Sequence, residues 1–258
     1  MRIALLCSLC LTVSLSAQEA GSKYTGPQLI SAMKAAQPTG AGDAKVRLTL
    51  KQEGKPTLQI QVKRRRTAEG ENLHLYQVLF PAGQKNEGLL LKVKGKSVSG
   101  MSYKPGGKPT ALAGDIRSQG LFGTDLLVED LLTDYLDWPE HKVIGTEKIK
   151  QTLCTIVEST PAAGSRGQVK KAKCWMDEAR MCPRKVEFLN GAGKVLRTVE
   201  TLDTVRSKGH IIPVELSITT AAAGSTTNVK GTGFNDDVTF DDADFTEQGL
   251  IQGVGRKE

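Results

Sequence analysis

The chain has 258 residues, a formal net charge of +7 and aromatic side chains at only 5% of positions. This length is ample to bury a core, in one large β-rich domain or two small ones. Scattered positive charges with few aromatic residues argue against a nucleic-acid-binding protein. The one basic run, residues 63–66, is typical of a solvated strand edge; the alternative is contact with anionic lipid headgroups.

The N-terminus predicts export. Arg2 precedes an apolar run from Ile3 to Leu15, and Ser16 and Ala17 supply small residues before polar sequence begins. This is the pattern of a secretory signal peptide over residues 1–17, cleaved near Ala17. The apolar run is too short to span a membrane, which takes about 20 apolar residues.

The cysteines bear on lipidation and on disulfides. Cys7 and Cys10 each follow a leucine inside the apolar run, whereas a lipoprotein signal needs a small residue there, so we expect no lipidation. Cys154, Cys174 and Cys182 remain after cleavage, and export permits a disulfide. Their spacing allows a Cys174–Cys182 bond or a Cys154–Cys174 bond, and it does not choose between them. The close CxxC spacings of a zinc site are absent.

Residues 18–44 predict one short helix with loose ends. Thr25 can cap it, Pro27 suits its first turn, and apolar residues recur at helical spacing from Leu29 to Ala36. Alternating apolar and polar residues then predict an antiparallel sheet joined by hairpins. Its first strands are expected at Val46–Lys51, Leu58–Lys63, Leu73–Phe80, Gly88–Val93 and Ser97–Tyr103.

Residues 124–138 interrupt this strand pattern. Thr124 and Asp125 form a good helix cap, and Leu127, Leu131 and Tyr135 then lie on one helical stripe. We expect one amphipathic helix of about three turns that buries this stripe on the sheet. Strands resume after it, for about eleven or twelve in total. They are expected at Val143–Thr146, Leu153–Ser159, Val169–Met176, Pro183–Leu189, Val195–Leu202, Ile211–Thr219 and Thr226–Gly233.

No pattern of catalytic residues is present. His74, His141 and His210 lie in separate segments, and the sequence lacks a GxSxG elbow, a P-loop and a GxGxxG turn. The acidic residues between Asp236 and Asp244 lack the spacing of an EF-hand and favour a solvated loop. We therefore expect neither an enzyme nor a bound metal or cofactor.

Several short motifs resemble the outer-membrane lipoprotein-sorting protein family, the LolA-like periplasmic proteins. Gly123–Leu131 matches the frame of that family's Gly-(Ser/Thr)-Asp-Phe-Ser-Tyr-Glu-Asp-Leu element, with leucine and valine at the aromatic positions. Later matches follow in the family's order: Gly145, Cys154, Cys174–Asp177, Gly193–Leu196 and Phe245–Leu250. The family's aromatic-rich Tyr-x-Pro strand is reduced here to Tyr103-Lys104-Pro105.

The resemblance implies a mainly β fold with inserted helices: an incomplete antiparallel β-barrel with a helical lid, over residues 18–250. The end of the sequence separately predicts a loose tail over residues 251–258. The resemblance also implies a monomeric periplasmic carrier that holds lipid or lipoprotein acyl chains and meets an inner-membrane export complex. Burying an acyl chain gains about 0.8 kcal/mol per CH₂ group. The expected lid contacts are Leu121, Phe122, Leu127 and Leu131. The alternative is a regulatory or scaffold module of the RseB type that binds a protein partner.

Overall fold

The computed structural model describes residues 22–36, 42–95, 97–132, 134–165 and 167–253. The predicted signal peptide, residues 1–17, lies outside these ranges. The described strands form one antiparallel sheet of thirteen strands, a little more than sequence patterns predict. They are β1 (Gly42–Gln52), β2 (Leu58–Arg66), β3 (Asn72–Phe80), β4 (Gly88–Lys94), β5 (Ser97–Tyr103), β6 (Thr110–Ala111), β7 (Glu140–Ile149), β8 (Thr152–Thr160), β9 (Lys171–Asp177), β10 (Cys182–Leu189), β11 (Val195–Ser207), β12 (His210–Thr220) and β13 (Ser225–Val238).

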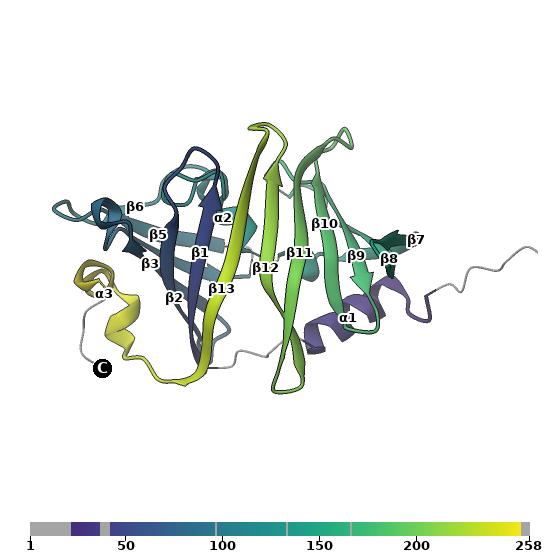
Figure 1. The fold of residues 1–258 in the computed structure, drawn as a ribbon, viewed down its shortest axis with the longest axis horizontal. Coiled ribbons are helices and arrows are strands. Elements are labelled where there is room, and N and C mark those ends of the chain that lie inside the picture. The colour runs from purple at the N-terminus through teal and green to yellow at the C-terminus, as the bar shows by residue number, and fades with distance from the viewer. Residues whose placement is uncertain (1–21, 37–41, 96, 133, 166, 254–258) are drawn as a thin grey trace, which may run out of the picture.

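The two halves of the chain build the two halves of this sheet. The strand order is β6-β5-β4-β3-β2-β1-β13-β12-β11-β10-β9-β8-β7, so β1 pairs with β13 and the sheet ends at β6 and β7. The edge strands do not pair with each other, and the sheet curves into an open half-barrel (Figure 1). The expected mainly β, incomplete barrel is confirmed.

Helical segments are short and lie on both faces of the sheet. The α-helices are α1 (Gly26–Ala36), α2 (Val128–Leu131) and α3 (Glu247–Gln252). The 3-10 helices are η1 (Ala82–Gln84), η2 (Ile116–Ser118), η3 (Asp134–Asp137) and η4 (Asp242–Phe245). Among the described residues, no helix has both the length and the apolar character needed to cross a membrane.

The face covered by α1 and α2 is called the inner face here, and it carries two apolar clusters. The first cluster joins residues of β1–β4, β12 and β13 to the segment around α2. Its most buried strand members are Leu50, Leu58, Ile60 and Leu91. The second cluster joins α1 and η3 to β8–β10. The predicted helix is confirmed as α1, where Thr25 Oγ1 accepts from the Gln28 N–H at 3.4 Å and Leu29 and Met33 are fully buried.

The outer face carries a third apolar cluster under the C-terminal segment. Alternation along β3 turns Leu73 and Leu75 outward, where they pack with Leu90, Phe245 and Leu250. The loose tail expected over residues 251–258 is therefore wrong at its start, because Ile251 and Gln252 belong to α3. Burial of Leu250 fixes this helix on the sheet. Residues 254–258 lie outside the described ranges.

The basic run is not a strand edge, because β2 lies between β1 and β3. Alternation divides it between the two faces. On the outer face, Lys63 pairs with Asp244 at 2.9 Å and Arg65 pairs with Asp43 at 2.6 Å. The Lys63–Asp244 pair and a second contact of Arg65, to Asp242 at 2.6 Å, fasten η4 to the sheet, so two charges of the run have a structural role.

Candidate functional site

A single crossover, residues 112–139, connects the two edge strands β6 and β7. It passes behind the sheet in the view of Figure 1, with α2 behind the central strands. The crossover contains η2, a bridge between Gly120 and Leu127, then α2 and η3. Because the ends of an open sheet are far apart, this connection must run over one face, and its side chains cover the inner face.

The crossover packs apolar side chains into the first inner cluster. Leu121 is 2% exposed and belongs to the cluster, and the half-buried Phe122 and Leu131 pack against it. Leu127 is half-buried in the bridge to Gly120 and is not a member of the cluster. The structure therefore brings three of the four expected lid residues together over the inner face and leaves Leu127 at the side.

The expected three-turn helix over residues 124–138 is wrong. The α-helix is limited to α2, and Leu132 after it is extended, with φ −100° and ψ 131°. The reason is that the crossover packs against both inner clusters. Leu131 and Leu132 pack on the first inner cluster, whereas Tyr135 and Leu136 of η3 belong to the second. The extended break lets each pair reach its own cluster.

Few polar contacts hold the first part of the crossover. Asp125 is the centre of one group: its carboxylate accepts from Gln52 Nε2 at 2.6 Å and from the Ser225 hydroxyl. The Asp125 N–H in turn donates to Gln52 Oε1 at 2.9 Å, which also accepts from the Thr227 hydroxyl. These bonds tie the crossover to the ends of β1 and β13.

An ion pair holds the second part. Arg197 Nη1 of β11 lies 3.2 Å from Asp130 Oδ1 of α2, and the two side chains are 11% and 1% exposed. The other carboxylate oxygen of Asp130 accepts from the Leu127 N–H at 2.7 Å. Burial raises the pKa of Asp130, and the Arg197 charge opposes this rise. Sequence reasoning missed this pair, because 67 residues separate its members.

The three described cysteines are buried free thiols, so the structure contains neither disulfide that their spacing allowed. Strand register supplies the reason. Cys174 lies opposite Val186, whereas Cys182 lies opposite Asp177, three residues further along β9. Cys154 is likewise three residues away from Val157, which lies opposite Cys174. Three residues span roughly 10 Å along a strand, beyond the Cα separation of about 7 Å that a disulfide tolerates. Among the described residues, no group of cysteine, histidine and acidic side chains has the arrangement of a metal site.

Comparisons with known proteins agree with this architecture. Residues 70–252 match the profile of a family described only as uncharacterized-protein-like. The chain belongs to that family. A DUF1329 family protein from Desulfovibrio piger superposes with a TM-score of 0.78 at 17% identity, covering 87% of this chain and 97% of its own. No curated protein matches the sequence.

Two further solved structures share this fold. A putative outer membrane lipoprotein-sorting protein domain from Vibrio parahaemolyticus has a TM-score of 0.78 at 17% identity, covering 88% of this chain and 98% of its own. A LolA superfamily protein from Nitrosomonas europaea has a TM-score of 0.65 at 16% identity, covering 86% and 98%. The family thus has the LolA-like fold, which confirms the resemblance in the sequence.

Proposed function

We propose that this LolA-like protein is a periplasmic carrier that holds the acyl chains of a lipid or lipoprotein between the crossover and the inner face. One observation carries the proposal: the inner face of an open sheet is apolar, and its cover is a separate segment rather than a second sheet. The name of the Vibrio parahaemolyticus relative supports it.

The packing of the crossover suits a cover that moves. Its contacts with the sheet are mainly apolar and therefore non-directional, so acyl chains can replace them at similar free energy. Its directional contacts with the sheet include the hydrogen bonds of Asp125 to Gln52 and Ser225 and the Arg197–Asp130 pair. A weaker bond runs from Gln84 to the carbonyl oxygen of Phe122. Breaking these contacts would let the crossover rise from the first inner cluster. Binding of this kind needs no catalytic group.

The proposal extends to the processing, location and cargo source of the chain. The exported chain is a monomer in the periplasm, cleaved near Ala17, and it takes its acyl cargo from an inner-membrane export complex. Absence of lipidation would leave it free to diffuse across the aqueous space.

Lipid extraction tests the proposal. We expect organic extracts of the exported chain, purified from its periplasm, to contain acyl lipid by mass spectrometry, and the delipidated protein to take up a fluorescent fatty acid. A purified chain without lipid that also takes up no fatty acid would refute the proposal.

A locked crossover tests where the lipid lies. In Q52C/D125C, a short bifunctional maleimide would join the crossover to β1, and the buried native thiols would react slowly. We expect the cross-linked protein to lose fatty-acid uptake, whereas the same variant without cross-linker retains it. Equal uptake by both forms would place the lipid elsewhere.

A further inference from the structure

Two charges of the basic run, Arg64 and Arg66, face inward, and Arg66 is exposed at the end of the strand. Among the described residues, Arg64 has no acidic partner within hydrogen-bonding distance. Arg64 follows Val62 by two residues on β2 and so faces the inner side, opposite Ala44 of β1 and His74 of β3. Its side chain is half-buried, and among the described residues it forms no hydrogen bond or ion pair. Its one specific contact is with an aromatic ring: the guanidinium carbon lies 5.9 Å from the centroid of Phe234.

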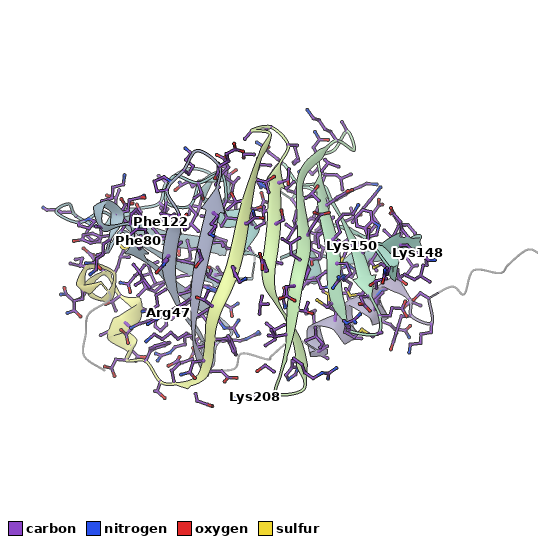
Figure 2. All side chains as sticks on the ribbon, in the orientation of Figure 1. Arg47, Phe80, Phe122, Lys148, Lys150 and Lys208 are labelled. Carbon is purple, nitrogen blue, oxygen red and sulfur yellow. The ribbon has the colours of Figure 1, made fainter. Side chains whose placement is uncertain are left out.

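The acid that acts electrostatically on Arg64 is engaged elsewhere. Asp236 of β13 raises the pKa of Arg64 through space, against the larger lowering caused by burial. Its carboxylate, however, lies 2.7 Å from Lys208 Nζ, at the tip of the β11–β12 hairpin (Figure 2). Within the part of the chain that the structure describes, the hydrogen-bond donors of Arg64 therefore stay free toward the inner face.

The polar side chains of His74 and Tyr76 on β3 lie beside Arg64. The rings of His74 and Tyr76 stack at 6.1 Å between centroids, and neither forms a hydrogen bond among the described residues. Burial lowers the pKa of His74 to about 4, so its imidazole is neutral at pH 7. Burial also raises the pKa of Tyr76. Their surroundings are therefore apolar enough to disfavour charge.

This combination is unusual for a structural site. A charge in an apolar environment is costly unless it is paired or hydrated. The unpaired nitrogen and oxygen atoms of Arg64, His74 and Tyr76 are not fully buried, so water or a ligand can reach them. Convergent polar groups on an apolar wall are instead typical of a ligand site. Phe234, 38% exposed, adds uncovered apolar surface beside the guanidinium.

We propose that Arg64, His74 and Tyr76 bind the anionic headgroup of an acyl lipid whose chain lies along the inner face. The proposal rests on the carrier function and names its substrate class. A guanidinium binds a carboxylate or phosphate through paired hydrogen bonds, and the imidazole and the phenol can each donate one more. The acylated cysteine of a lipoprotein carries ester, thioether and amide groups without a negative charge, so the site favours a fatty acid or a phospholipid.

Ligands that share one alkyl chain and differ in their headgroup test which part of the lipid the site recognises. Calorimetry would compare dodecanoate, dodecyl phosphate and dodecanol, which share one alkyl chain, with inorganic phosphate as the anion without a chain. We expect the exported chain to bind the two anionic amphiphiles about tenfold or more tightly than dodecanol. R64M should abolish this preference, whereas R66M, which removes an exposed charge of the same strand, should keep it.

Each contrary outcome has its own meaning. Equal binding of dodecanol and dodecanoate, unchanged in R64M, overturns the headgroup site and leaves the carrier function intact. Binding of none of the three amphiphiles overturns both proposals. Competition by inorganic phosphate at the same concentration as dodecyl phosphate shows a free-anion site and overturns the lipid assignment. R64K retains the charge but not the planar fork, so it should keep part of the preference and provides the test if R64M does not fold.

Discussion

Asp130 of the crossover and Arg197 of β11 form an ion pair that is almost completely removed from water, at 3.2 Å. Removal of one partner leaves the other charge buried, and such losses typically cost about 3–5 kcal/mol. We therefore expect D130N to lower the free energy of unfolding by about that amount, measured by urea denaturation.

A double-variant cycle checks that the loss comes from the pair. Replacing both members by apolar residues of similar size, in D130L/R197M, should recover most of the stability because no charge stays buried. The exposed Lys230–Glu215 pair, at 3.1 Å, is the control: K230M should cost less than about 1 kcal/mol. A double variant as unstable as D130N would contradict this explanation.

Arg65 should be essential for docking the C-terminal segment. Its guanidinium donates to Asp43 at 2.6 and 2.8 Å, to Asp242 at 2.6 Å and to the carbonyl oxygen of Phe240. We expect R65M to destabilise the protein by about 2–4 kcal/mol and to expose η4 and α3 to limited proteolysis. R66M, whose side chain is exposed, should change stability by less than about 0.5 kcal/mol. Proteolysis of R65M at the wild-type rate would be evidence against this role.

Sequence patterns predicted the sheet because most strands have one wet and one apolar side. The same reasoning failed at the crossover, where Leu127, Leu131 and Tyr135 have helical spacing yet no helix joins them. Local periodicity cannot show that Leu131 and Tyr135 serve different clusters. Tertiary packing decided this element.

The partners of the basic run could not be predicted from the sequence for a related reason. The four residues of the basic run look equivalent in the sequence, but the strand turns Lys63 and Arg65 to one face and Arg64 to the other. Their environments then depend on η4 and β13, between 170 and 181 residues further along the chain. Only the register of the sheet distinguishes a structural arginine from a candidate binding residue.

Cys154, Cys174 and Cys182 should stay reduced and unreactive in the folded protein. Burial raises the pKa of Cys174 to about 12 and that of Cys182 to about 11, so little reactive thiolate forms at pH 8. We expect Ellman's reagent to react slowly with the native chain that lacks residues 1–17, and all three thiols to react in denaturant without a reductant. Fewer than three reactive thiols in denaturant would reveal a disulfide.

His74 should make stability depend on pH between about 4 and 6.5. Burial lowers its folded-state pKa to about 4, whereas the unfolded chain binds a proton near 6.5. The unfolded state therefore binds more protons in this window, so the contribution is fully present above pH 6.5 and is lost as the pH falls toward 4. The loss amounts to about 3 kcal/mol across the window.

The matched variant H74Q removes this titration and keeps a polar side chain. Burial raises the pKa of Asp130 and Glu129, which favours the folded state as the pH falls, but these groups are common to both proteins and cancel in the difference. Urea denaturation at pH 7, 6, 5 and 4.5 should show the wild-type protein losing stability relative to H74Q at each step below 6.5. Parallel pH profiles would mean that His74 is solvated in the folded protein, because burial is the main cause of its lowered pKa, with the Arg64 charge second.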